Sequence, residues 1–233
     1  MKTSKYFEYQ NKVKKAYSQL RKAYSEIKDS YNEMIFRFAL AAEYKDESTG
    51  IHLVKIADYS TEIAHELKLS KADVECLRYA SPMHDVGKLI IPDAILKKEG
   101  GLTPEEREIM KTHTVLGADI FKNARSPLLK AARVISLTHH ERYDGTGYPN
   151  GLRGRGIPLF GRIVAVADVF DALVSKRPYK EPYDFGEAIK LIVEASGTQF
   201  DPDIIKAFIK RKDKIKEIWT ATKDIEKFIN EKG

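Results

Sequence analysis

The stretch HHERYDGTGYP, residues 139–149, ends one helical pattern and begins a long loop. Before it, a segment that begins at Ser126-Pro127 and runs toward His140 has apolar residues at helical spacing. Residues 160–175 have the same helical spacing. Between these segments, residues 144–158 hold five glycines and two prolines, a composition that favours a loop. The sequence therefore predicts a long loop between two helices, and loops of this length inside a compact domain are usually functional or disordered.

The rest of the chain is also helical in pattern. Ser70 is a candidate N-cap, and Thr103-Pro104-Glu105-Glu106 has the form of a capping box with proline at the first helical position. No convincing run of alternating strand residues occurs, so the sequence predicts an all-α fold. The further helices are expected at residues 51–67, 71–83, from 103 onward, from 184 onward and at 201–219.

The N-terminal segment carries an unbroken heptad pattern, with apolar or aromatic residues spaced by 4 and 3 positions in alternation. We expect residues 5–43 to form one long helix, and we divide the chain into residues 1–43 and 44–233. Two interpretations remain open: an amphipathic helix packed on its own domain, or a coiled-coil-like helix that forms a parallel homodimer or relays a signal. The seam consists of Val13, Tyr17, Leu20, Tyr24, Ile27, Tyr31 and Met34.

Composition excludes several classes of protein. The single cysteine, Cys76, allows no intramolecular disulfide and no cysteine-based metal cluster, which favours a reducing, cytoplasmic location. No apolar run approaches the ~20 residues that span a bilayer, so no membrane segment is expected. The formal net charge is +6, but lysines and glutamates are interspersed and no nucleic-acid-binding motif accompanies them. Nucleic-acid binding is therefore not predicted.

The chemistry-bearing residues are six histidines, two of them in the dipeptides His84-Asp85 and His139-His140. A single buried histidine is usually a core residue, but five of them beside glycine-containing turns and acidic residues are harder to explain by packing. Histidine with carboxylate, and without thiolate, makes a site suited to iron, manganese or zinc. The sequence therefore predicts a metal centre.

The order of His52, His84-Asp85 and Asp168 resembles the HD phosphohydrolase superfamily, and the stretch at residues 139–149 resembles its HD-GYP branch. HDVGKLIIPDAIL (84–96), GRIVAVADVFDALVSKRPYK (161–180) and GTQFDPDIIKAF (197–208) also look like family segments, so the resemblance covers roughly residues 40–210. It implies an HD-domain helical bundle and a metal-dependent phosphodiesterase. The implied reaction opens cyclic di-GMP to linear pGpG, to GMP, or to both.

The resemblance also implies two divalent transition-metal ions, iron or manganese, that share Asp85 as a bridging and catalytic residue. Many family members have a glutamate for a third ion four residues before the first histidine, where this chain has Ser48. Two ions are therefore expected, although Glu47 on an irregular turn would allow a third. One ion is expected to bind His52, His84, Asp85 and Asp168, and the other Asp85, His113, His139 and His140.

Four residues are candidates for the substrate. Lys88 lies four residues after His84 and is expected to reach the scissile phosphate, as a catalytic and binding residue. By resemblance Arg177 and Lys180 bind the substrate phosphates. Tyr148 either stacks on guanine or simply packs in the loop. Asp171 is expected to orient a neighbour, and His65, in the middle of a predicted helix, is given no role in the site.

Two other functions remain open. The chain could act on another cyclic dinucleotide or phosphoester, because guanine selectivity depends on pocket shape. Alternatively it could be a binding module for cyclic dinucleotides that has lost turnover, although that interpretation predicts missing ligands and only the glutamate of the third ion is absent. A sensor domain or a protein partner would also suit a chain that begins with a coiled-coil-like helix.

Overall fold

The computed structural model describes residues 2–46, 50–176 and 181–230, with side chains described for residues 7–45, 50–176 and 181–222. Within these ranges the chain forms α-helices and short 3-10 helices, with no strand beyond an isolated bridge between Ser196 and Phe200. The predicted all-α fold is confirmed. Four residues with expected roles lie outside the described ranges: Glu47, Ser48, Arg177 and Lys180.

The chain divides into two compact units, Met1–Phe38 and Ala39–Gly233. The α-helices are α1 (Lys2–Glu43), α2 (Ile51–Glu66), α3 (Lys71–Ala80), α4 (Asp93–Leu96), α5 (Pro104–Lys111), α6 (His113–Ile120), α7 (Pro127–Thr138), α8 (Leu159–Val174), α9 (Phe185–Glu194), α10 (Pro202–Lys210) and α11 (Lys212–Asn230). The 3-10 helices are η1 (Tyr44–Asp46), η2 (Ser81–Met83), η3 (Val86–Ile90) and η4 (Gly154–Gly156). Of these, η2 and η3 flank the His84-Asp85 dipeptide, and η4 lies in the glycine-rich loop.

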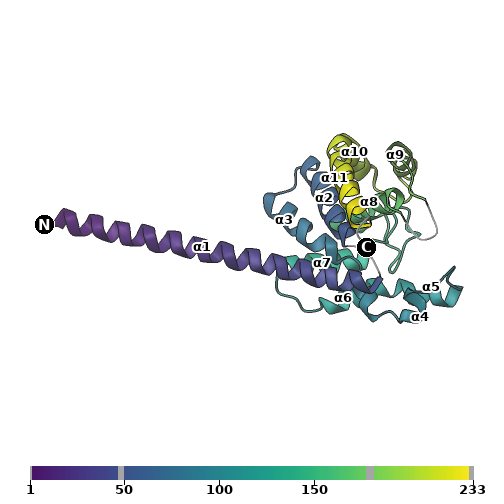
Figure 1. Ribbon diagram of the computed structural model, residues 1–233, viewed down its shortest axis with the longest axis horizontal. Helices are drawn as coiled ribbons and strands as arrows, with labels where there is room; N and C mark the ends of the chain where they lie inside the picture. The colour runs from purple at the N-terminus through teal and green to yellow at the C-terminus, as the bar shows by residue number, and fades with distance from the viewer. Residues whose placement is uncertain (1, 47–49, 177–180, 231–233) are drawn as a thin grey trace. The chain divides into compact units, whose positions relative to one another are not determined.

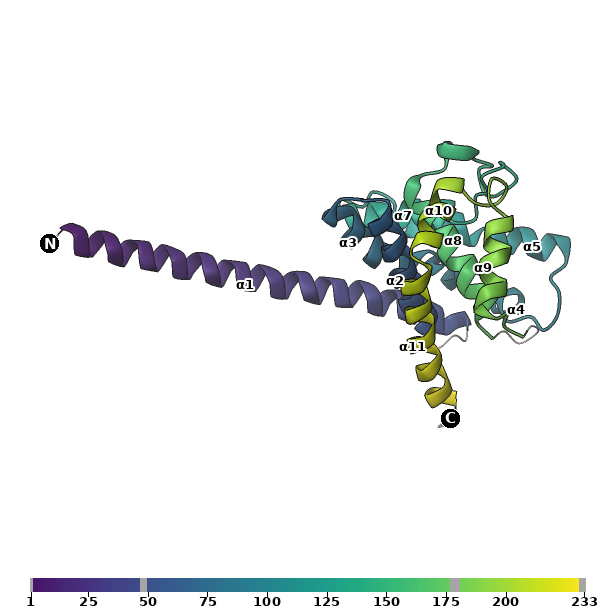
Figure 2. The ribbon, with the colours of Figure 1, turned by 90° about the horizontal axis from the view of Figure 1, so that it is seen from above.

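Helices α2 and α8 form the centre of the second unit. Helix α8, LFGRIVAVADVFDALV, is apolar on nearly every side, and a helix of this kind is stable only when other elements surround it. It packs against α2, α7, α9 and α10, and Figures 1 and 2 both show α10 and α11 beside this pair. The ring of Phe170 meets Tyr59 of α2 at 5.2 Å and Phe208 of α10 at 5.1 Å, between centroids. This aromatic cluster joins three helices far apart in sequence.

Local sequence signals set several helix starts. Ser70 accepts a hydrogen bond from the Asp73 backbone N–H, as an N-cap does. The capping box at Thr103 and Glu106 is formed in both directions, and α7 begins at Pro127 as expected. The predicted caps at Ser70 and Thr103 are confirmed.

Two predicted helices are wrong in their extent. The helix predicted at residues 71–83 ends as an α-helix at Ala80, and residues 81–83 form the 3-10 helix η2. Residues 201–219 are not continuous, because α10 ends at Lys210 and α11 begins at Lys212. At the break, Arg211 leaves helical geometry and its Nε donates to Glu62 of α2 at 2.8 Å. Neither proline nor glycine marks the position, so local sequence patterns gave no sign of the break.

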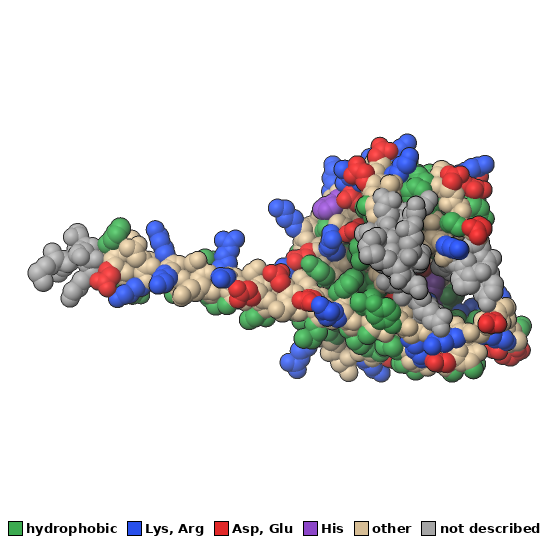
Figure 3. Space-filling model, in the orientation of Figure 1, with side chains coloured by type: hydrophobic (Ala, Val, Ile, Leu, Met, Phe, Trp, Pro, Cys, Tyr) green, Lys and Arg blue, Asp and Glu red, His purple; other side chains and the backbone are tan. Residues whose placement is uncertain are grey.

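Helix α1 is a single helix of 42 residues. Its heptad seam is solvent-exposed, with exposed fractions of 69% at Tyr17, 68% at Leu20 and 69% at Ile27. Figure 3 shows hydrophobic side chains on the surface of this helix among lysines, arginines and acidic residues. In the described part of the chain, no helix is both long enough and apolar enough to cross a bilayer.

Candidate metal centre

The His84-Asp85 dipeptide lies where α3 gives way to a tighter helix. Pro82 lacks a backbone N–H and cannot continue the α-helical hydrogen bonds, and the chain tightens into η2 directly after Ala80. His84 is the C-cap residue of η2 and Asp85 is the N-cap residue of η3, so both side chains leave the backbone at the junction of two short helices. Asp85 lies beside His113 and His139, and His84 lies beside His52 and Asp168.

Gly87 allows η3 to lie directly against α6. A Cβ at Gly87 would come within 1.9 Å of the His113 carbonyl oxygen and 2.5 Å of the Gly117 nitrogen. Only a residue without a side chain fits such a close backbone approach. His113 is the first residue of α6, so this contact brings it next to Asp85.

The remaining histidines and Asp168 come from three other helices. His139 and His140 directly follow the last residue of α7, and the glycine-rich loop begins after them. His52 is the second residue of α2, and Asp168 lies within α8. Packing of α8 against α2 and α7 therefore brings these side chains together.

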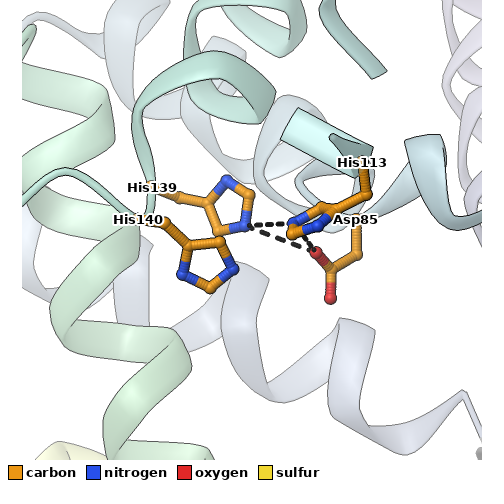
Figure 4. A group of neighbouring side chains, drawn as sticks. All are labelled: Asp85, His113, His139 and His140. Carbon is orange, nitrogen blue, oxygen red and sulfur yellow. Dashed lines mark hydrogen bonds and ion pairs between the residues drawn. The ribbon is translucent and has the colours of Figure 1, made fainter. Parts of the chain in front are cut away.

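Asp85 lies at the centre of the first group of candidate ligands. Its Oδ1 is 3.1 Å from His113 Nε2 and 3.3 Å from His139 Nε2, and these two nitrogens are 3.5 Å apart. Figure 4 shows the rings of His113, His139 and His140 gathered around this carboxylate. One ligand atom from each of the four residues lies within 4.8 Å of the others, a spacing at which one metal ion can contact all four.

The second group contains His52, His84 and Asp168, again with ligand atoms within 4.8 Å of one another. Asp168 Oδ1 is 3.8 Å from the Nε2 atom of each histidine. The other Asp85 oxygen, Oδ2, lies 3.4 Å from His84 Nε2. The two oxygens of Asp85 thus face different groups, which is the arrangement of a bridging carboxylate.

In four of the histidines Nδ1 is already hydrogen-bonded, so Nε2 is the ring atom available to bind a metal ion. His84 Nδ1 donates to the Ser81 carbonyl at 3.0 Å, and His113 Nδ1 donates to the Met110 carbonyl at 2.8 Å. His139 Nδ1 bonds the carbonyls of Ile135 and Ser136, and His52 Nδ1 bonds a carboxylate. A carbonyl can only accept, so Nδ1 carries the proton in the histidines bonded to carbonyls. Histidines that bind a metal through one ring nitrogen usually form such a hydrogen bond with the other. Imidazole nitrogens together with carboxylate oxygens are ligands that fit divalent metal ions.

His84 gives a further sign that a cation belongs here. Its Nε2 is fully buried, and among the residues that the structure describes it has no hydrogen-bond partner. Buried polar atoms without a partner are costly and rare in native proteins. Burial alone would lower the pKa of His84, but Asp85 and Asp168 outweigh it and raise the pKa to about 9. A metal ion can take the place of that proton.

The charges of the other ligands also suit a metal site. Burial alone would raise the pKa of Asp85, but Lys88 and His84 outweigh it and hold the pKa well below its usual value. Asp85 is therefore ionised at any physiological pH. Burial, together with neighbouring His139, lowers the pKa of His140 well below its ordinary value, so its imidazole is neutral and able to bind a metal ion.

Behind His52 lies a buried chain of charged groups. Asp171 Oδ2 accepts from His52 Nδ1 at 2.7 Å, so Asp171 orients a neighbour as predicted. Lys55 Nζ lies 2.9 Å from the other Asp171 oxygen and 2.8 Å from Ser175 Oγ. The side chains of Lys55 and Asp171 are 3% and 2% exposed, so each neutralises a charge that would otherwise be buried alone.

Hydrogen bonds to Glu141 hold the glycine-rich loop beside the histidines. The buried carboxylate of Glu141 accepts hydrogen bonds from the backbone N–H groups of Asn150 at 2.8 Å and Leu152 at 2.9 Å. Tyr148 stacks on His140 with 4.8 Å between ring centroids. Burial, with the negative charge of Asp85, raises the pKa of Tyr148, so its hydroxyl stays protonated. Tyr148 therefore packs in the loop and also lies at the metal centre.

The structure brings together all seven predicted metal ligands, and Lys88 lies with them, its Nζ 2.8 Å from Asp85 Oδ2. His65 is exposed on α2, away from the two groups. Lys55 and Glu141 were not expected from sequence. Glu141 lies within the stretch at residues 139–149, and this position was the signal in the sequence that pointed to it. Lys55 is buried because α2 packs against α8, and no local sequence pattern marks it.

Comparison with known proteins decides the family. The HD domain family profile matches residues 26–204. The chain belongs to the HD domain family. This result confirms the family resemblance stated from the sequence, and it agrees with the helical fold and the His-Asp centre.

Two curated members show how far the similarity extends. A cyclic di-GMP phosphodiesterase of Thermotoga maritima is 46% identical over 185 residues, which cover 79% of this chain and 50% of that protein. A 3'3'-cGAMP-specific phosphodiesterase 2 of Vibrio cholerae is 38% identical over 192 residues, which cover 82% of this chain and 37% of that protein. This chain therefore spans half or less of the length of these relatives.

Among solved structures, a cyclic GMP-AMP specific phosphodiesterase of Vibrio cholerae shares the fold. The TM-score is 0.63 at 20% sequence identity, and the alignment covers 85% of this chain and 53% of that one. At this identity the match supports the helical HD fold.

Proposed function

We propose that this protein is a metal-dependent phosphodiesterase that hydrolyses cyclic di-GMP to linear pGpG, to GMP, or to both. The observation that carries the proposal is the Asp85 carboxylate, whose two oxygens face two separate groups of histidine ligands. The 46% identity to a cyclic di-GMP phosphodiesterase supports this substrate.

In this proposal, two divalent ions, iron or manganese, are held by the two groups that share Asp85. When bound, such ions supply an activated water and positive charge for the phosphate in the transition state. A lone pair on the water oxygen would form the new bond to phosphorus while the bond from phosphorus to the 3' oxygen breaks. The water loses one proton and the 3' oxygen gains one. Ser48 in place of a glutamate supports two ions over three.

The proposed roles of the basic residues follow from charge and position. Lys88 Nζ lies 2.8 Å from Asp85 Oδ2 at the edge of the centre, where an ammonium is able to contact a phosphate oxygen. Arg177 and Lys180 follow α8 in sequence, and we assign them to the substrate phosphates on family resemblance. Tyr148 is proposed as an aromatic wall of the substrate site.

A second candidate substrate is a mixed cyclic dinucleotide. It is favoured by 38% identity to a relative named as specific for 3'3'-cGAMP. Both substrates share the phosphodiester that the centre would open, and they differ in one base. Selectivity between them is therefore a property of the base pockets and not of the metal ligands.

The proposal extends to location and assembly. A cytoplasmic location is supported by the lone cysteine, Cys76, which can form no disulfide within the chain. A homodimer through the N-terminal helix is supported by the exposed heptad seam.

The test is hydrolysis by protein purified and reconstituted anaerobically with iron or manganese. Cyclic di-GMP and 3'3'-cGAMP are supplied separately and the products resolved by chromatography. We expect turnover of cyclic di-GMP with about two ions per chain by elemental analysis, loss of one ion in His140→Ala, and loss of both in Asp85→Ala. Metal-replete protein that cleaves neither dinucleotide would refute the proposed activity, and cleavage of 3'3'-cGAMP alone would favour the second candidate.

A further inference from the structure

The exposed seam of α1 consists of two rows of side chains. At heptad spacing, one row is aliphatic and the other is aromatic, and each row repeats every seven residues. Exposed fractions along the seam run from 37% at Tyr31 to 69% at Met34, although large apolar side chains of this kind are normally covered. The aliphatic row is Val13, Leu20, Ile27 and Met34, and the aromatic row is Tyr17, Tyr24 and Tyr31.

A second copy of the same helix is the occupant that fits this seam. Identical helices with the same heptad period present rows that match along their whole length, so each apolar layer meets an apolar layer. The ion pairs that α1 forms within itself, Glu8 with Lys12 and Glu26 with Lys22, lie on its outer face and leave the seam apolar.

The residues beside the seam differ sharply in charge. One flank carries Lys14, Arg21 and Lys28, and the other carries Ala16, Ala23 and Ser30. In a parallel pair, each flank faces the opposite flank of the partner helix, so the basic row faces a neutral row. In an antiparallel pair, each flank faces its own copy.

An antiparallel pair would therefore bring like charges together. With the seams fully overlapped, Lys14 would face Lys28 and Arg21 would face Arg21 of the partner helix. Like charges in these positions are destabilising, whereas the parallel pair has no such contact. We infer that α1 forms a parallel, in-register homodimer whose orientation is selected by the basic row of Lys14, Arg21 and Lys28.

The neutral flank also suits the aromatic row. Ala16, Ala23 and Ser30 each directly precede a seam tyrosine. Small side chains there leave room for the bulky rings, and the tyrosine hydroxyls reach water at the edge of the pair. The parallel arrangement thus satisfies both the charge pattern and the size pattern.

Cysteine cross-linking of the full chain tests the orientation. In a Cys76→Ser background, Val13→Cys and Tyr31→Cys are oxidised mildly, alone and mixed, and the linked peptides are identified by mass spectrometry. A parallel pair should link position 13 to position 13 of the partner helix, and position 31 to position 31. Predominant linkage of position 13 to position 31 would overturn the parallel orientation.

Light scattering over a concentration series tests the dimer itself. Leu20→Glu with Ile27→Glu should shift the equilibrium to monomer and leave metal content unchanged, because the centre lies in the second unit. A second variant, Lys14→Ala/Arg21→Ala/Lys28→Ala, removes the basic row. Its dimer should persist, but in the cysteine assay cross-links between positions 13 and 31 should appear. A strictly monomeric wild type at high concentration, or a basic-row variant that still links only identical positions, would refute the inference.

Discussion

At the scale of single residues, the candidate metal centre has supporting side chains that are not themselves candidate ligands. His52 is held by Asp171, and Asp171 is in turn held by Lys55. Burial alone would raise the pKa of Asp171, but its hydrogen bond to His52 and the charges of His52 and Lys55 outweigh it and lower the pKa. Asp171 therefore remains an anion that fixes one orientation of the His52 ring.

Lys55→Met should weaken metal binding without touching a ligand. The substitution keeps the aliphatic volume but leaves Asp171 with one fewer cationic neighbour, and the His52 ring loses its fixed orientation. Loss of an outer-shell partner typically lowers metal affinity by roughly 10–100-fold. We expect that decrease for one of the two ions only, measured by metal titration with elemental analysis.

Two controls separate this effect from loss of charge or of folding. Lys71→Met removes an exposed lysine from α3 and should leave both ions bound. Lys55→Arg keeps the cation beside Asp171 and should recover part of the lost affinity. Equal metal affinity in Lys55→Met and wild type would show that Lys55 does not position His52.

At the scale of the element, the centre is built mostly from helix ends. His52 is near the start of α2, His113 begins α6, and His139 and His140 follow the end of α7. At helix ends, some backbone carbonyls have no partner in the helix and can accept a hydrogen bond from a histidine Nδ1. Short helices that meet at one point therefore orient several imidazoles at once.

Gly87→Ala should separate η3 from α6. The added Cβ would meet backbone atoms of His113 and Gly117, which cannot move aside as a side-chain tip can. Overpacking of this kind typically costs about 1–3 kcal/mol, occasionally more. We expect a lower urea midpoint at unchanged slope, and weaker binding of the ion assigned to Asp85 and His113.

Gly101→Ala is the matched control. A Cβ at Gly101 meets nothing within 4 Å, so its effect should stay within about 0.5 kcal/mol. If Gly87→Ala had the same midpoint and metal affinity as Gly101→Ala, the close approach of η3 and α6 would not be what positions Asp85.

At the scale of the whole molecule, the centre joins candidate ligands that lie between His52 and Asp168 in the sequence and come from several helices. Metal binding should therefore stabilise the second unit. Free metal at 100 times the Kd contributes about 2.7 kcal/mol per site, and each kcal/mol raises the Tm by ~2–4 °C for a chain of this size. We expect manganese to raise the wild-type Tm by roughly 5–10 °C per occupied site, followed by scanning calorimetry.

The Asp85→Ala variant is the comparison for this prediction. Without the shared carboxylate, manganese should produce little change in Tm, and a chelator should reverse the wild-type increase. A similar increase in wild type and Asp85→Ala would mean that manganese stabilises the protein at some other place.

Local patterns in the sequence were enough to predict much of this protein. Helical periodicity, the caps at Ser70 and Thr103, and the glycines after His140 report on interactions within a few residues, and local chemistry decides those interactions. A metal centre could be predicted because only a few residue types bind metal ions, whereas the individual His and Asp ligands were named from the family resemblance. Their order along the chain, not their separation in space, carried the family resemblance.

Only the tertiary structure decided the features that join distant segments. Arg211, at the break between α10 and α11, meets Glu62 of α2. Lys55 is buried against Asp171 of α8, and Tyr148 contacts His140 because the loop folds back. Nothing in the neighbouring sequence distinguishes Lys55 from a solvent-exposed lysine, because its environment is set by residues more than 100 positions away. Sequence therefore determined which groups are available, and packing determined which of them meet and with what charge.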